Sequence, residues 1–146
     1  MLEADAAAVA GWHYDDQYAF YDFDADATDL AELLDPVGWG DTYYAADGDD
    51  GVLAGFFQFV RHANVVDLGL GLQPRLVGHG LGSAFLDTGL RFAAERCVPE
   101  LFTLEVAAFN SRAIVVYERA GFVEVERFEH RTNGALHPFV RMSRHA

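Results

Sequence analysis

The alternation of apolar and polar positions is clearest in residues 65–90. From 65 to 72, leucines fall on one face of a predicted strand, and aspartate and glycines fall on the other. Positions without side chains on that second face indicate that another group approaches the backbone closely there. Pro74 ends the strand because proline has no N–H for the ladder. Beyond Gly82 the apolar positions recur every three or four residues, which predicts a helix that buries one side.

The same reasoning predicts the remaining elements. They are helices over 4–11, 28–34 and 110–120, a strand over 101–106, and hairpins formed by 41–46 with 52–61 and by 122–131 with 135–144. Thr28 and Asn110 are the expected N-caps of the second and last helices. Asn133-Gly134 is the expected tight turn of the last hairpin, and Pro138 predicts a bulge or an open side in its second strand. With 146 residues and no repeat or linker, we expect a single domain, residues 1–146.

The glycine-rich loop before the long helix carries the first candidate chemistry. A helix start leaves about four backbone N–H groups without partners, and the glycines from Gly78 to Gly82 let a ligand reach them. Such a loop binds an anion such as pyrophosphate, or it is a tight turn without a ligand. It is not a P-loop, because the chain contains no Lys. It is not a dinucleotide fingerprint either, because Ser83 or Phe85 stands where the third glycine belongs.

Composition and charge exclude several classes of partner. The formal charge is 10 − 23 = −13, which argues against nucleic-acid binding because a phosphate backbone requires a basic face. No run of about 18 apolar residues predicts a membrane span. The single Cys and the spacing of the six His residues predict neither a disulfide framework nor a metal site. Without a signal-peptide pattern, the expected location is the cytoplasm. The surplus of Asp favours a salt-loving source, although a GC-rich genome is the alternative explanation for the missing Lys.

Two segments together resemble the signatures of the GNAT superfamily of acyl-CoA N-acyltransferases. The strand, Pro74 and the glycine loop are similar to the family's acyl-CoA loop, x-x-[Q/R]-G-x-G-x-G. The stretch LEVAAFNSRAIVVYERAGF, residues 104–122, is similar to its second signature, a strand, an Asn and an x-Y-x-x-x-G-F helix end. The resemblance extends from Val52 to the C-terminus. One departure is Val77, where the family usually has Gln or Arg; Arg75 is a candidate substitute, and otherwise backbone donors hold the phosphates.

The resemblance implies an α+β fold, in which helices flank a mixed, mostly antiparallel central sheet and the family's first edge strand is missing or reduced. It implies acetyl-CoA as co-substrate, no metal, and a primary amine as acceptor, either a small molecule or a protein N-terminus. It leaves open whether the chain acts as a homodimer. The residues that it assigns to acetyl-CoA are Leu70, Gly71, Leu72, Val77, Gly78, His79, Gly80, Leu81, Gly82, Ser83, Asn110 and Ala113.

Two side chains are the expected catalytic groups. By the resemblance, Tyr117 protonates the departing thiolate, with a buried structural tyrosine as the alternative. Asn110 lies seven residues earlier, so both fall on nearly one helical face. Glu105 occupies a central strand, where a carboxylate is costly unless it is paired or used. It is either the ion-pair partner of an arginine or the general base, the role of the corresponding Glu in the branch of the family that acetylates protein N-termini.

The acceptor is expected to bind to the aromatic and acidic stretch 13–29. The family builds its acceptor wall from the first two helices and the turn between them, and carboxylates with aromatic rings suit an ammonium group. The candidates are Tyr14, Asp15, Tyr18 and Tyr21, with Asp16 and Asp22 beside them. A solvated acidic loop is the alternative. Two other functions remain open: a non-catalytic acyl-CoA sensor on the same fold, and an interaction protein whose acidic stretch binds a basic partner.

Overall fold

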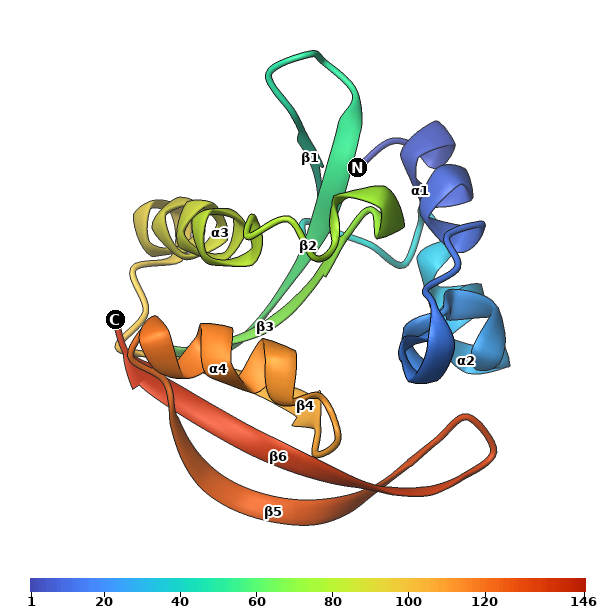
Figure 1. Cartoon of the computed structure of the whole chain (residues 1–146). Helices are drawn as coiled ribbons and strands as arrows, with labels where there is room; N and C mark the ends of the chain where they lie inside the picture. The colour runs from blue at the N-terminus through green and yellow to red at the C-terminus, as the bar shows by residue number, and fades with distance from the viewer.

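The computed structural model describes residues 1–146 and contains one six-stranded mixed sheet in the order β1-β2-β3-β4-β6-β5 (Figure 1). The strands are β1 (Tyr43–Asp47), β2 (Leu53–His62), β3 (Val65–Leu72), β4 (Leu101–Ala107), β5 (Val123–Thr132) and β6 (Ala135–His145). The helices are α1 (Glu3–Ala10), α2 (Ala27–Leu33), α3 (Gly82–Cys97) and α4 (Ser111–Arg119), with short 3-10 turns η1 (Asp16–Tyr21), η2 (Phe23–Ala25) and η3 (Pro74–Leu76). Only β3 and β4 are parallel neighbours. The predicted fold class is therefore confirmed.

Helices cover both faces of the sheet because successive strand residues point to opposite sides. Phe57 and Leu68 pack with Leu86 of α3 in the larger core, against which α4 also lies. Phe56 points the other way and packs with Val9 of α1 in the smaller core. Pairing with β2 continues to the end of β3, where Leu72 lies opposite Gly55. No helix combines the length and apolar character that crossing a bilayer requires.

The strand glycines accommodate a neighbouring side chain of the protein itself. A Cβ added to Gly71 would lie 2.4 Å from Cε1 of Phe56, the residue opposite it in β2. A Cβ added to Gly69 would be in ordinary contact with Gln58 at 3.4 Å. The close approach that the glycine pattern predicted is therefore real, and at Gly71 the approaching group is an aromatic ring of β2.

The two central strands pair only at their beginnings and then diverge. Val65–Asp67 of β3 pairs with Leu101–Thr103 of β4, and the two strands separate beyond that point (Figure 1). On its other side β3 stays paired with β2, and the N–H of Gln73 still donates to β2 at 2.8 Å. Because bonding direction alternates along an antiparallel ladder, Leu70 and Leu72 direct their backbone N–H and C=O groups into the opening between β3 and β4.

Most predicted elements are present, and the first edge strand is missing, as expected. No strand precedes α1, and β1 lies at the edge of the sheet. The prediction of Thr28 as N-cap was wrong: Asp26 accepts from the N–H groups of Thr28 (2.9 Å) and Asp29 (3.2 Å). The same carboxylate also accepts from the N–H of Asn133 at 2.9 Å, a tertiary contact that favours the earlier cap. Pro138 has the open side at its nitrogen, since β4 ends opposite Phe139; its carbonyl still accepts from the N–H of Ala108 at 2.9 Å.

Candidate active site

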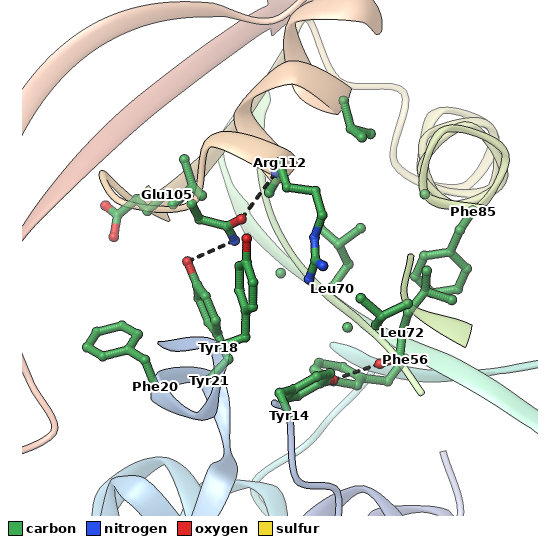
Figure 2. A pocket seen from close by; sticks show the side chains of 18 of the residues that line it. Tyr14, Tyr18, Phe20, Tyr21, Phe56, Leu70, Leu72, Phe85, Glu105 and Arg112 are labelled. Atoms are coloured by element: carbon green, nitrogen blue, oxygen red, sulfur yellow. Dashed lines mark hydrogen bonds between the residues drawn. The ribbon is translucent and has the colours of Figure 1, made fainter. Parts of the chain in front are cut away.

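The divergence of β3 and β4 produces a cleft with a volume of about 530 Å³. Its walls are the open end of β3, the glycine loop, one face of α4, and the segment before α2 (Figure 2). Of the residues that the sequence assigns to acetyl-CoA, ten line it: Leu70, Gly71, Leu72, Val77, Gly78, Gly80, Leu81, Gly82, Asn110 and Ala113. His79 and Ser83 do not line it; Ser83 faces a small separate hollow. That the lining residues bind acetyl-CoA stays a prediction.

The glycine loop offers backbone donors without side chains in the way. Gly78 (φ +82°) and Gly80 (φ +73°) adopt left-handed conformations, and a Cβ at either would meet nothing within 4 Å. Leu81 at the N-cap of α3 supplies no side-chain acceptor to the first turn. Arg75 bonds to Gln73 at 2.5 Å and does not line the cleft. An anion at this helix start would therefore meet backbone N–H groups.

Helix α4 directs one tyrosine into the cleft. Asn110 is 9% exposed, and its Oδ1 accepts from the N–H of Ala113 at 3.1 Å, which confirms the predicted cap. Tyr117 lines the cleft from the same helix and packs edge-on against Phe122. Burial raises the pKa of Tyr117, and the neighbouring Tyr21 raises it further. The Tyr117 hydroxyl therefore keeps its proton at neutral pH and can donate a hydrogen bond.

Glu105 lies in an ion-pair network at the side of the cleft. Its Oε1 is 2.6 Å from Nη2 of Arg141, the residue opposite it in β6, and Arg141 also binds Glu126 at 2.5 Å. The carboxylate of Glu105 points away from Leu70 and Leu72 (Figure 2). Glu105 still counts among the lining residues. The ion pair that the sequence left as an alternative is thus present, and a role as base stays a prediction.

Three of the predicted acceptor residues line the cleft and one does not. Tyr14, Tyr18 and Tyr21 face it, whereas Asp15 is exposed outside it. The ring of Tyr18 lies 4.0 Å under the guanidinium of Arg112, which reaches across the cleft from α4 (Figure 2). Burial raises the pKa of Tyr14 and of Tyr21. The aromatic wall is therefore present, and of the expected carboxylates Asp22 lines the cleft, whereas Asp15 and Asp16 do not.

Two further carboxylates at the acceptor end were not predicted from the sequence. Asp29 and Glu32 of α2 line the cleft together with Tyr43 and His130. Burial raises the pKa of Asp29, and the nearby Asp26 and Glu32 add to it. Burial, together with the carboxylates of Glu32 and Asp29, raises the pKa of Tyr43 to about 12. A spacing of three residues put Asp29 and Glu32 on one helical face, but nothing local showed that this face meets the end of β5.

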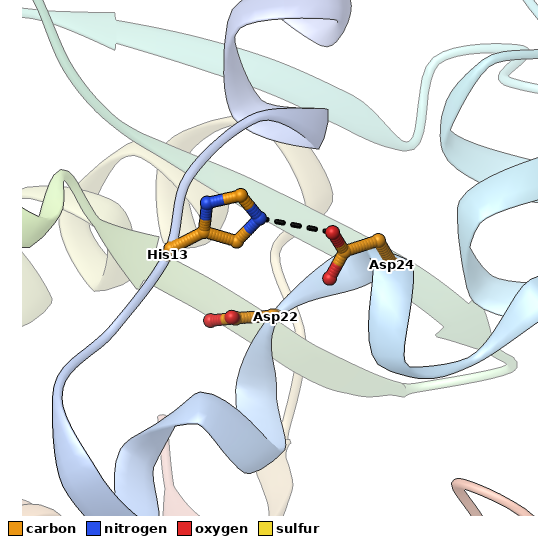
Figure 3. A group of neighbouring side chains, drawn as sticks. All are labelled: His13, Asp22 and Asp24. Atoms are coloured by element: carbon orange, nitrogen blue, oxygen red, sulfur yellow. Dashed lines mark hydrogen bonds and ion pairs between the residues drawn. The ribbon is translucent and has the colours of Figure 1, made fainter.

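His13, Asp22 and Asp24 lie close together in and beside the same segment, and Asp22 also lines the cleft (Figure 3). Nε2 of His13 is 2.9 Å from Oδ2 of Asp24, and this contact raises the pKa of His13. Oδ1 of Asp22 accepts from the N–H of Tyr14 at 2.8 Å. These bonds join the beginning of the segment to its end and account for the grouping.

Comparisons with known proteins agree with this geometry. Residues 6–122 match the family described as Acetyltransferase (GNAT) family. The mycothiol acetyltransferase of Streptomyces scabiei is 36% identical over 129 residues, which cover 86% of this chain and 39% of that protein. The mycothiol acetyltransferase of a Nocardioides species is 33% identical over 149 residues, 89% of this chain and 47% of that protein. The chain thus spans less than half the length of these curated relatives.

Solved structures share the fold over nearly the whole chain. A spermidine N-acetyltransferase chimera from Vibrio cholerae and hSSAT superposes with a TM-score of 0.80 at 18% identity, covering 98% of this chain and 90% of that chain. The spermidine N-acetyltransferase from Vibrio cholerae in complex with CoA and spermine has a TM-score of 0.79 at 16% identity, covering 99% and 92%. At such identities the similarity concerns the fold alone.

Proposed function

Because this chain belongs to the acetyltransferase (GNAT) family, we propose that it transfers the acetyl group of acetyl-CoA to a primary amine. The observation that carries the proposal is the open edge of β3 beside a glycine-opened helix, with Tyr117 in the same cleft. Amides of the loop and of the first turn of α3 hold the pyrophosphate. The pantetheine arm lies along β3 like an added strand.

The hydrogen-bonding groups at the end of β3 have different roles in this proposal. The carbonyl of Leu72 already accepts from the hydroxyl of Tyr14 at 2.7 Å. The backbone groups of Leu70 are therefore left for the pantetheine amides, and the N–H of Leu72 is left for the carbonyl oxygen of the thioester. A backbone donor there stabilises the negative charge that develops when the amine attacks.

The transfer forms a C–N bond and breaks the C–S bond; the nitrogen of the neutral amine loses one proton and the sulfur gains one. An acceptor that arrives as an ammonium ion loses one further proton, to the base, before it attacks. An amine with a pKa near about 10 is mostly protonated at neutral pH, which requires a base. Glu105 takes this role through water, because its carboxylate faces Arg141 and points away from the end of β3. Tyr117 donates a hydrogen bond to the sulfur as the thiolate departs, and burial keeps its hydroxyl protonated for this purpose.

The lining of the cleft favours a small cationic amine as acceptor. The acceptor end carries Asp22, Asp29 and Glu32 among aromatic rings, and Arg112 is the one arginine in the lining. An ammonium group gains from carboxylates and from aromatic faces. The names of the relatives (mycothiol) and of the solved structures (spermidine) point to different acceptors. The acceptor class of this chain is therefore inferred from its own residues.

The test is a thiol-release assay with acetyl-CoA against a panel of small amines and peptides, at low and high salt. We expect CoA release with cationic small amines, and release about 100-fold slower or more in the Tyr117→Phe variant under the same conditions. If acetyl-CoA binds but no amine in the panel causes release of CoA, the sensor function is favoured. No binding of acetyl-CoA by calorimetry would overturn the proposal.

A further inference from the structure

The segment 13–22, called here the bridging segment, contacts both arms of the cleft through tyrosine hydroxyls. The hydroxyl of Tyr14 donates to the carbonyl of Leu72, at the end of β3, at 2.7 Å. The hydroxyl of Tyr21 accepts from the N–H of Ala107, at the end of β4, at 3.1 Å and from Nδ2 of Asn110 at 3.2 Å (Figure 2). We infer that Tyr14 and Tyr21 form a clamp that sets the separation of β3 and β4 at the thioester end of the cleft.

Nothing in the sheet itself sets this separation. The last paired residues of the two strands are Asp67 and Thr103, where Thr103 Oγ1 also donates to Asp67 Oδ1 at 2.8 Å. Beyond this point each arm pairs only with its outer neighbour, β3 with β2 and β4 with β6. The two tyrosine hydroxyls bind backbone groups near the open ends of both arms, where a small change of angle at the junction moves the arms furthest.

The bridging segment is stiff enough to hold a fixed distance between its two hydroxyls. Six of its residues form the 3-10 turn η1. The N–H of Tyr14 donates to Asp22 at 2.8 Å, which closes the segment on itself. The carbonyl of Phe20 accepts from Nδ2 of Asn133 at 2.8 Å, which ties the segment to the turn of the last hairpin. The contacts of Tyr14 with Leu72 and of Tyr21 with Ala107 therefore act as the two ends of one strut.

The clamp also connects the acceptor wall with the catalytic helix. Asn110 donates to Tyr21 through Nδ2, and its Oδ1 caps α4, the helix that carries Tyr117. Tyr14 and Tyr21 are thus positioning residues, which act through Leu72 and Asn110 on the slot that the proposed function assigns to the acetyl thioester. A strut fails when either end is released, so losing both hydroxyls should weaken acetyl-CoA binding no more than losing one.

The experiment is a double-mutant cycle on the whole chain with Tyr14→Phe, Tyr21→Phe and both together, in which the Kd of acetyl-CoA is measured by calorimetry. We expect each single variant to bind about 3- to 10-fold more weakly, the effect of one hydrogen bond. The double variant should match the singles, whereas independent contacts would multiply to about 10- to 100-fold. Tyr44→Phe is the matched control, because Tyr44 packs against Phe59 and Phe92 outside the cleft and should leave the Kd unchanged.

A second measurement separates failure of the clamp from failure of the proposed function. Amide hydrogen exchange without acetyl-CoA should show that Tyr14→Phe speeds exchange at Ala107, across the cleft, as well as at the end of β3. Tyr21→Phe should likewise speed exchange at Gln73, whose N–H donates to the carbonyl of Ala54 at 2.8 Å at the end of β3. Exchange that changes only beside the substituted residue, or multiplicative losses of affinity, would overturn the clamp. If the wild-type chain does not bind acetyl-CoA, but the two variants still change exchange across the cleft, only the proposed function is contradicted.

Discussion

A methyl group at Gly80 tests whether the glycine loop holds acetyl-CoA by its backbone. Gly80 has a φ of +73°, and a Cβ there would meet nothing within 4 Å. Gly80→Ala therefore creates no clash within the protein, and its effect on folding comes from the left-handed backbone, about 1–2 kcal/mol. For a chain of this size that destabilisation lowers the Tm by about 2–8 °C.

Gly51 provides the matched control for this substitution. Its φ is +77°, a Cβ there also meets nothing within 4 Å, and it lies in the turn between β1 and β2, outside the cleft (Figure 1). Gly51→Ala should therefore lower the Tm to a similar extent. Only Gly80→Ala should also weaken acetyl-CoA binding, because its methyl group occupies the space from which a phosphate approaches the amides. Losing one charge-assisted hydrogen bond, about 1.5–3 kcal/mol, weakens binding by about 10- to 150-fold.

Thermal melts and calorimetric titration with acetyl-CoA on the wild type and both variants make the comparison. Equal loss of Tm with a selective loss of affinity in Gly80→Ala would support phosphate binding by the loop. An affinity in Gly80→Ala equal to that of Gly51→Ala would refute it, because the open space above the loop would then not be the phosphate site.

Three further predictions concern the reacting groups and pH. Tyr117→Phe should lower kcat about 100-fold or more with the Kd of acetyl-CoA unchanged, measured by thiol release and calorimetry; full turnover would remove Tyr117 from the reaction. Glu105→Gln should abolish the acidic limb of the kcat/KM profile against pH, and a limb that persists would place the base elsewhere. Burial raises the pKa of four tyrosines, that of Tyr43 to about 12. The folded chain then keeps protons that the unfolded chain loses near about pH 10, so stability should be unaffected below that pH and fall as pH rises through the folded pKa values. Denaturant midpoints that do not fall above about pH 10 would contradict the tyrosine assignment.

Features set by neighbouring residues were predictable from the sequence. The alternation in β3, the stripe of α3 and the turn at Asn133 follow from local periodicity and backbone preference, and the structure has all three. The Asn110 cap was predictable for the same reason, since its partner is the amide three residues ahead. The N-cap of α2 was not, because Asp26 is also held by the turn after β5.

Contacts between distant residues required the tertiary structure. Glu105 was either a paired carboxylate or a base, and only the register of β4 against β6, which sets it opposite Arg141, showed the ion pair. The carboxylates of α2 reached the cleft through the packing of α2 against the rest of the chain, which no local pattern encodes.

The sequence by itself determined the order of elements, the glycine-opened helix and the tyrosine on α4, because each depends on residues within a few positions of one another. The tertiary structure decided how far β3 and β4 diverge and which side chains lie between them. That separation depends on where pairing between the two strands stops. It also depends on the hydroxyls of Tyr14 and Tyr21, which come from a distant segment of the chain and bond to the ends of the two strands. Hydrogen bonds of this kind depend on distances in space, which periodicity along the sequence does not specify.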